Sequence, residues 1–128
     1  MIVVDSSAAI DYFAWRQRGA WVERQLLDSD LHAPHLFDLE VAAALRRLVL
    51  RGVTSSAAAD AVLADLAELP LARYPHLPLL PRVWELRSGL TPYDAVYVAL
   101  AEELDAPLLT TDPRLARAPG LPVEVIAP

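Results

Sequence analysis

The 128-residue chain contains no cysteine and no lysine, and it has only four glycines. The missing cysteines exclude disulfides and thiolate metal sites, although they do not identify the redox compartment. No apolar run approaches the roughly 20 residues of a membrane-spanning helix. The first residues lack the basic segment and the small-residue cleavage site of a signal peptide, since Asp5 interrupts the apolar start. We therefore expect a cytoplasmic protein without a membrane segment.

Positive charge is also scarce, with 11 basic against 17 acidic residues and a formal net charge of −6. This is the wrong sign for a protein that holds nucleic acid by bulk electrostatics, so it counts weakly against such a partner. All basic residues are arginine, which suits phosphate oxygens, but such uniformity is also typical of a biased genome composition. The hydrophobic share of 55% predicts either a generous core or a buried partner surface.

Short apolar segments alternate with helical patterns along the chain, without repeats or a linker. We expect one domain over residues 1–128, because this length is close to the usual domain size. Strands separated by helices favour an α/β fold with a central parallel sheet covered on both faces. The expected strands cover residues 1–4, 31–33, 71–74, 108–110 and 123–126, and the expected helices 8–15 (capped by Ser6 or Ser7), 21–27, 36–51, 55–69, 78–88 and 92–105.

Four acidic residues stand at distant places where a strand should end or a helix should begin. Asp5 and Asp112 each close an apolar strand, and Glu40 and Asp94 lie near the starts of strongly apolar helices. Open α/β sheets bind ligands at the carboxyl ends of their strands, so the strand-end acids are expected at such an edge. If all four converge, their repulsion requires a positive charge, and a hard divalent cation is the simplest candidate.

The segments around these acids follow one another in a pattern that spans almost the whole chain. They are IVVDSSA at 2–8, EVA at 40–42 followed by LRR at 45–47, LTPYDAVYVALA at 90–101, and LTTDPRL at 109–115. An aspartate after a short strand is common, whereas the four segments together are specific. The pattern resembles the PIN-domain family and, within it, the VapC-type ribonuclease toxins of type II toxin–antitoxin pairs.

The resemblance implies a PIN-like three-layer α/β/α fold and an Mg²⁺- or Mn²⁺-dependent endoribonuclease. Such an enzyme hydrolyses phosphodiester bonds in structured RNA, either tRNA or rRNA, and is held inactive by a VapB-like antitoxin; a homodimer is also implied. The catalytic residues are then Asp5, Glu40, Asp94 and Asp112. Asp5 and Asp94 are expected to be the direct metal ligands, Asp112 to complete the site, and Glu40 to orient or deprotonate the attacking water.

Each acid also has a purely structural explanation. Asp94 fits the third position of a helix whose N-cap is Thr91, close to a capping box. Asp112 and Asp5 could each cap the helix that follows them. Glu40 lies about one turn inside its helix, where the macrodipole would stabilise it. These explanations stay open beside the catalytic one, because a cap can hold a carboxylate in place for ligation.

Asp38 competes with Glu40 for the second position of the acidic site. Residues two positions apart on a helix point in directions about 200° apart, so Asp38 and Glu40 cannot face the same site. The resemblance selects Glu40. Ser6 and Thr110 are candidates to donate hydrogen bonds to the carboxylates, and Arg114 is a candidate phosphate contact.

Proteins of other classes also place aspartates at strand ends. Receiver domains and haloacid-dehalogenase-type phosphatases both rely on a lysine, and this chain has none. The phosphatases also need a second acid two residues after the first, where Ser7 stands. Two alternatives remain: a non-toxin PIN-like nuclease acting on other RNA or DNA, and a catalytically idle PIN-like module that only binds a partner.

Overall fold

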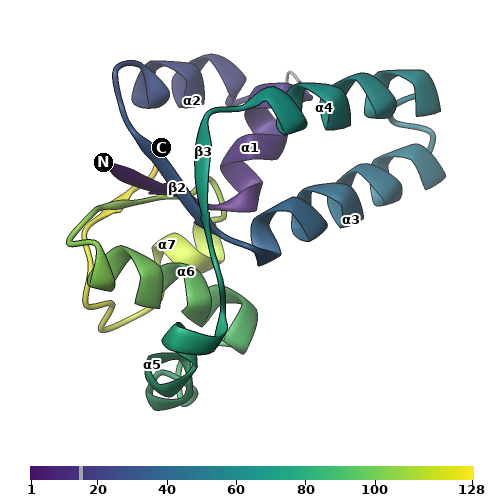
Figure 1. Ribbon diagram of the computed structural model, residues 1–128. Helices are drawn as coiled ribbons and strands as arrows, with labels where there is room; N and C mark the ends of the chain where they lie inside the picture. Colours follow the sequence, from purple (N-terminus) through teal and green to yellow (C-terminus); the bar gives the residue numbers. More distant parts are fainter. Residues whose placement is uncertain (15) are drawn as a thin grey trace.

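A parallel sheet forms the centre of the molecule in the computed structural model, which describes residues 1–14 and 16–128 (Figure 1). Within these residues the sheet has five strands in the order β3-β2-β1-β4-β5, and each pair of neighbours is parallel. The strands are β1 (Ile2–Val4), β2 (Leu31–Pro34), β3 (Leu71–Tyr74), β4 (Leu108–Leu109) and β5 (Val125–Ile126).

The strand order reverses at β1, and this reversal decides where a ligand can bind. The chain moves outward from β1 through β2 to β3 and then returns to place β4 on the other side of β1. Val3 accordingly pairs with His32 on one side and with Leu108 on the other. The carboxyl ends of β1 and β4 therefore flank the topological switch point, where ligands bind in open α/β sheets.

Helices cover the two faces of the sheet, as the alternating pattern predicts. In chain order they are α1 (Ser6–Phe13), α2 (Gly19–Leu26), α3 (Leu36–Leu50), α4 (Ser56–Glu68), the 3₁₀ turn η1 (Leu77–Leu79), α5 (Leu80–Glu85), α6 (Pro92–Glu103) and α7 (Pro113–Ala116). Helix α6 packs on β1, β2 and β4, with α5 against it, whereas α1 contacts α2 and α3 (Figure 1). Helices α3 and α4 form an antiparallel pair that extends away from the sheet, here called the arm (Figure 1).

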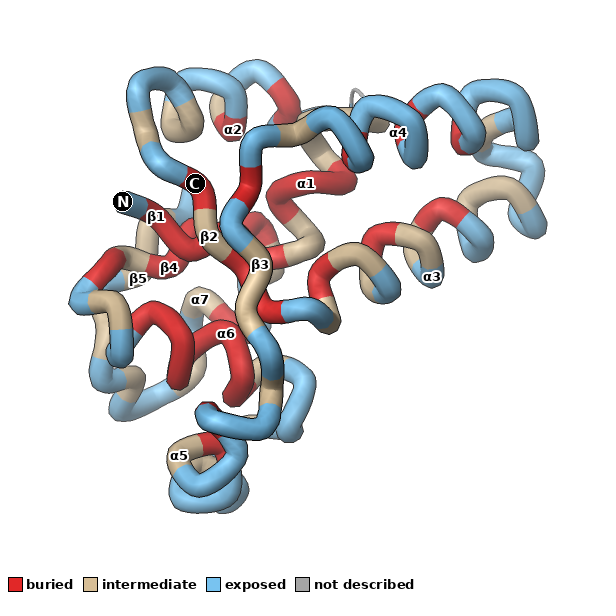
Figure 2. The backbone as a smooth tube through the Cα atoms, viewed as in Figure 1, coloured by how far each residue is buried: buried red, intermediate tan, exposed pale blue. Residues whose placement is uncertain are grey.

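The core is formed by the strands, by α6 and by the buried faces of α1, α2 and α3, and the arm is more exposed than α6 (Figure 2). Seven successive residues of α6, 95–101, are buried, so this helix is covered on all sides and not only along one stripe. The central strands β1 and β4 are wholly apolar and buried, as expected for strands covered on both faces. The three-layer α/β/α architecture with a central parallel sheet is confirmed.

Most differences from the expected elements concern their ends. The N-cap of α1 is Asp5 and not Ser6 or Ser7, and its side chain makes no capping bond. The segment predicted as a helix over 78–88 is divided into η1 and α5, because prolines follow one another there. The expected end of the first helix at Trp15 lies outside the described residues. Among the described residues, no helix has the length and apolar content that crossing a membrane requires.

Candidate active site

Asp5 is a buried carboxylate at the end of β1, with 5% of its surface exposed. The Ser7 hydroxyl donates to its Oδ2 at 2.6 Å, and the Thr110 hydroxyl donates to the same oxygen at 2.8 Å. Backbone N–H groups of Thr111 and Asp112 donate in turn to these two hydroxyls, each at 3.1 Å. The carboxylate is therefore held by the end of β4, through a network that orients it toward the switch point.

Burial raises the pKa of Asp5, and the negative charges of Asp94 and Asp112 raise it further. The hydrogen bonds from Ser7 and Thr110 lower the pKa, but they do not cancel the effect of burial. A buried acid that also experiences like charges is unusual in a purely structural role. The capping explanation does not hold for this residue, because its carboxylate accepts from the hydroxyls of Ser7 and Thr110 and makes no capping bond to the backbone of α1.

Glu40 lies in the second turn of α3 and is fixed by a tyrosine from α6. The Tyr97 hydroxyl donates to Glu40 Oε1 at 2.7 Å, and the Ser6 hydroxyl donates to the same atom at 3.4 Å. Burial raises the pKa of Glu40, and the charges of Asp5 and Asp94 add to this, whereas the Tyr97 hydrogen bond lowers it. Burial and the acidic neighbours also raise the pKa of Tyr97, so its phenol stays protonated and keeps donating.

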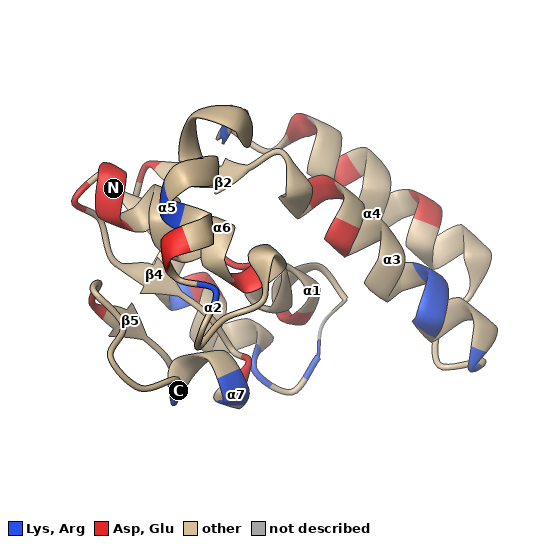
Figure 3. Cartoon of the chain, turned by 90° about the horizontal axis from the view of Figure 1, so that it is seen from below, with Lys and Arg blue, Asp and Glu red and all other residues tan. Residues whose placement is uncertain are grey.

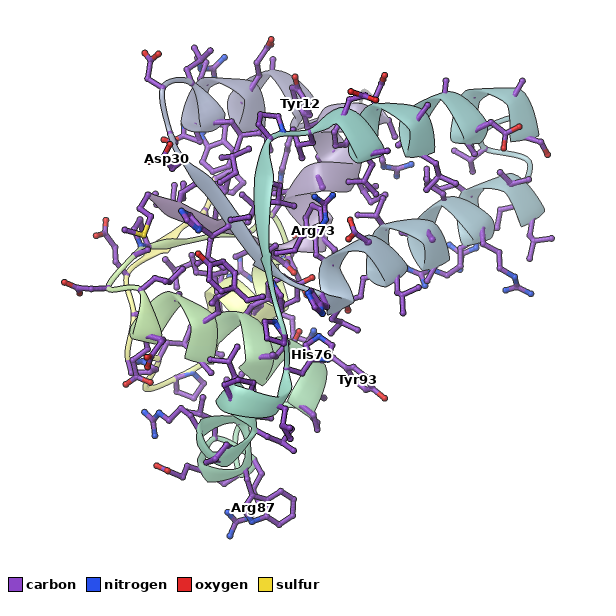
Figure 4. All side chains as sticks on the ribbon, viewed as in Figure 1. Tyr12, Asp30, Arg73, His76, Arg87 and Tyr93 are labelled. Carbon is purple, nitrogen blue, oxygen red and sulfur yellow. The ribbon has the colours of Figure 1, made fainter. Side chains whose placement is uncertain are left out.

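The start of α3 is held in place by a histidine that follows β3. His76 Nε2 accepts the Leu36 backbone N–H at 2.8 Å, which satisfies one of the unpaired donors at the helix N-terminus (Figure 4). The N-cap residue itself, His35, supplies no side-chain bond. Because this cap lies one turn before Glu40, it helps to set the position of that side chain.

Asp38 points away from the site, as the helical geometry predicts. Its two carboxylate oxygens accept from Arg73 Nε at 2.7 Å and Arg73 Nη2 at 3.1 Å. Figure 4 shows Arg73 on β3, directed toward the start of α3. Asp38 is therefore an ion-pair partner of β3, and Glu40 is the acid of α3 that faces Asp5.

Asp94 and Asp112 occupy helix N-termini and share one arginine. The Thr91 hydroxyl accepts the Asp94 backbone N–H at 3.2 Å, and Asp112 Oδ1 accepts the Arg114 backbone N–H at 2.9 Å. Asp112 thus caps α7 through its side chain, whereas at Asp94 the cap is supplied by Thr91 and the Asp94 carboxylate is not used for it. The remaining carboxylate oxygens meet the Arg114 guanidinium, with Nη1 2.8 Å from Asp94 and Nη2 3.1 Å from Asp112.

All four acids line one open cleft of about 790 Å³ at the switch point. Residues from α1, the segment after it, α3, α6 and the β4–α7 connection contribute to its walls, and the arginines among them are Arg16, Arg18, Arg47 and Arg114. The structure thus brings together Asp5, Glu40, Asp94 and Asp112 from four separate elements. Tyr97 is the site residue that sequence reasoning missed, although it stands three residues after Asp94 and so on the same helical face.

The carboxylate oxygens that line the cleft suit a hard cation such as Mg²⁺ or Mn²⁺, because such cations prefer oxygen ligands. The side chains are not arranged as a closed metal cage: within residues 1–14 and 16–128, no three acidic or histidine side chains stand close enough to surround an ion. Asp94 and Asp112 instead meet at the Arg114 guanidinium, which confirms that this corner of the cleft accommodates positive charge.

Comparison with known proteins agrees with this arrangement. The PIN domain model matches residues 2–121. Ribonuclease VapC1 of Mycobacterium tuberculosis (strain CDC 1551 / Oshkosh) is 51% identical over 125 residues, which covers 96% of this chain and 94% of the relative. Ribonuclease VapC12 of the same strain is 42% identical, covering 98% and 97% of the two chains.

A solved structure has the same fold at low sequence identity. The crystal structure of VapBC2 from Rickettsia felis bound to a DNA fragment from its promoter matches with a TM-score of 0.70 and 12% identity, covering 99% of this chain and 98% of that one. At such identity the match concerns the fold alone. The family model and the near full-length relatives carry the assignment: the chain belongs to the PIN-domain family and, within it, to the VapC-type ribonucleases.

Proposed function

We propose that this chain is an Mg²⁺- or Mn²⁺-dependent endoribonuclease that acts as the toxin of a VapBC-type pair. Its reaction is the hydrolysis of phosphodiester bonds in structured RNA, either tRNA or rRNA. The observation that carries the proposal is the convergence of four carboxylates in one cleft at the switch point. Relatives named ribonucleases, 42–51% identical over nearly the full length, support RNA as the substrate.

Asp5 and Asp94 are the proposed metal ligands, and Asp112 completes the site on the side of α7. Asp5 suits this role because two hydroxyl donors fix one of its oxygens. Bound there, Mg²⁺ or Mn²⁺ would polarise the scissile phosphate and lower the pKa of the attacking water. The raised pKa of Asp5 means that its buried charge is disfavoured until a cation balances it.

Glu40 is the proposed general base that orients and deprotonates the attacking water. A base is most effective when its pKa is closer to the working pH, and burial raises the pKa of Glu40 in that direction. The Tyr97 hydroxyl fixes one carboxylate oxygen at 2.7 Å, which leaves the other for the water. The negative charge of Asp5 also raises the pKa of Glu40, so the two carboxylates lie close enough to interact.

Arginines on the cleft wall are the proposed contacts to the RNA backbone. Arg16, Arg18 and Arg47 are exposed, and among the described residues they form no ion pair with a carboxylate. Arg18 Nη1 donates to the Thr111 carbonyl at 3.1 Å, which holds it beside the acids. In Figure 3 the basic segments of α3 and α7 appear in blue on a chain whose net charge is −6. Local positive charge here offsets the unfavourable overall sign.

A VapB-like antitoxin and a second copy of the chain are the proposed protein partners. Large apolar side chains are exposed along the arm and the loop at its tip, among them Leu39, Leu50, Val53 and Leu63. Exposed apolar groups in this number favour a protein interface. Because the proposed RNA and antitoxin are cytoplasmic molecules, we place the activity in the cytoplasm, and we propose that residues 1–128 act as one domain.

The test is cleavage of total RNA by purified protein with Mg²⁺ or Mn²⁺, followed by mapping of the new RNA ends. We expect a small number of defined sites in tRNA or rRNA, loss of cleavage in excess EDTA, and no cleavage by Glu40→Gln. Full activity in EDTA would contradict the metal mechanism. Cleavage of DNA in preference to RNA, or binding without cleavage, would favour the two alternatives of a different nuclease or an idle binding module.

A further inference from the structure

One arginine bridges the two acids at the entrance of the site. Arg114 donates from Nη1 to Asp94 Oδ2 at 2.8 Å and from Nη2 to Asp112 Oδ2 at 3.1 Å. The side chain of Arg114 is 66% exposed, whereas those of Asp94 and Asp112 are 16% and 29% exposed. The guanidinium therefore covers the two carboxylates from the solvent side.

The backbone of Arg114 is anchored independently of this contact. Its N–H donates to Asp112 Oδ1 at 2.9 Å as the helix cap of α7, and any residue at position 114 other than proline can make that bond. The long exposed side chain can therefore swing away without disturbing α7. By contrast, Asp94 is fixed in the first turn of α6 and Asp112 at the N-cap of α7.

The cleft would otherwise collect uncompensated negative charge. Asp5 and Glu40 are buried with raised pKa values, and the charge of Asp94 contributes to both shifts. The hydrogen bond and charge of Asp94, together with the charge of Asp112, raise the pKa of Arg114, so its guanidinium stays charged at every physiological pH. A dication binding to Asp94 would have to compete with the Arg114 guanidinium, which is already paired with that carboxylate and would repel the ion.

We propose that Arg114 is a positioning residue that acts as an internal counter-cation: it holds Asp94 and Asp112 together and must move aside when the divalent ion binds. This inference rests on the proposed function, since it concerns the same metal site. The exchange lowers the apparent affinity for metal, because the ion pairs with Arg114 are lost when the ion binds. While no metal is bound, Asp94 and Asp112 stay paired with Arg114 and keep their orientation.

The test measures Mn²⁺ binding to the complete chain by isothermal titration and by the loss of the free-ion electron paramagnetic resonance signal, without RNA. Arg114→Gln should bind Mn²⁺ about three- to tenfold more tightly, as expected from exposed ion pairs of typical strength. Arg114→Lys, which keeps the charge but loses the planar fork, should lie between the two. Arg117→Gln is the matched control, because it removes the same charge from an exposed position just after α7 that does not line the cleft.

Far-ultraviolet circular dichroism and the melting temperature in EDTA establish that each variant is folded. The rise in melting temperature at a fixed Mn²⁺ concentration should also be larger for Arg114→Gln than for the wild type. Equal Mn²⁺ affinity in wild type and Arg114→Gln, or equal tightening in Arg117→Gln, would overturn the inference and leave the proposed function intact. Absence of Mn²⁺ binding in both the wild type and Arg114→Gln would instead overturn the metal mechanism itself.

Discussion

Replacing Asp5 with asparagine should stabilise the metal-free protein at neutral pH while abolishing cleavage. Both hydrogen bonds to Asp5 end on Oδ2, so the amide oxygen of an asparagine can accept them from Ser7 and Thr110 without a change in volume. What the substitution removes is a charge that is 5% exposed and that repels Asp94 and Asp112. Metal-free wild-type protein carries that cost whenever Asp5 is ionised.

The magnitude follows from two opposing terms. The effective penalty of a buried ion is several kcal/mol. The variant loses about 2 kcal/mol of stability when two charge-assisted hydrogen bonds become neutral ones, at about 1 kcal/mol for each bond. The net expectation is a gain of about 1–3 kcal/mol in the free energy of unfolding, or roughly 4 °C in melting temperature per kcal/mol for a domain of this size.

The assay is thermal and urea unfolding in EDTA at several pH values, with Asp11→Asn as control. Asp11 also lines the cleft but is only half-buried, so its replacement should change stability by less than about 0.5 kcal/mol. Since the pKa of Asp5 is raised in the folded state, the wild type gains stability as the pH falls through that pKa toward 3.8, and its deficit against Asp5→Asn should disappear. A variant less stable than wild type at pH 7, or a difference independent of pH, would refute the reasoning.

Three further predictions concern the other walls of the cleft. Glu40→Gln should stop cleavage and relieve growth arrest on expression. Asp38→Asn should remain toxic and should lose at most about 1 kcal/mol of stability, because the ion pair of Asp38 is half-exposed. The opposite pattern in a growth assay would mean that Asp38, and not Glu40, is the acid of the site. Tyr97→Phe removes the hydrogen bond that lowers the pKa of Glu40, so the acid limb of the pH–rate profile should move to higher pH, and an unmoved limb would exclude Glu40 as the base. Arg47→Gln should weaken RNA binding and reduce the slope of log affinity against log salt concentration by about 0.7–0.9. Arg46→Gln is the control and should leave both unchanged, because Arg46 is exposed but does not line the cleft. Equal slopes for the two variants would mean that Arg47 does not contact the RNA.

Several parts of the fold could be predicted from local sequence alone. The helix expected over 55–69 is α4, and its serine cap is Ser55, whose hydroxyl accepts the Ala58 N–H at 3.1 Å. The helix expected over 36–51 ends at Leu50 in the structure, and Gly52 just beyond it has a positive φ of 72°, a conformation that glycine adopts without steric cost. Strand β3 has the predicted bounds. These features depend on interactions within a few residues, which a local pattern records.

Features that depend on contacts between distant segments could not be predicted from the local sequence. Gly19 begins α2 at a point where an added Cβ would stand 2.6 Å from the Asp11 carbonyl oxygen, a close approach that no local pattern marks. Ser7 was expected as a cap, but its hydroxyl joins Asp5 to the end of β4. No local pattern marks Arg73 as the partner of Asp38, since 35 residues separate them.

The sequence by itself determined which chemistry the protein carries: four carboxylates at strand ends and helix starts, no thiolate ligand and no lysine, within a pattern typical of one family. It also determined the alternation of strands and helices, because hydrophobic period and turn residues are local properties. Only the tertiary structure decided that Asp5 is buried under hydroxyls of β4, that Tyr97 holds Glu40, and that Arg114 spans Asp94 and Asp112. Burial and charge coupling arise when segments about 20 to 100 residues apart pack together, and the raised pKa values of Asp5 and Glu40 arise from that packing.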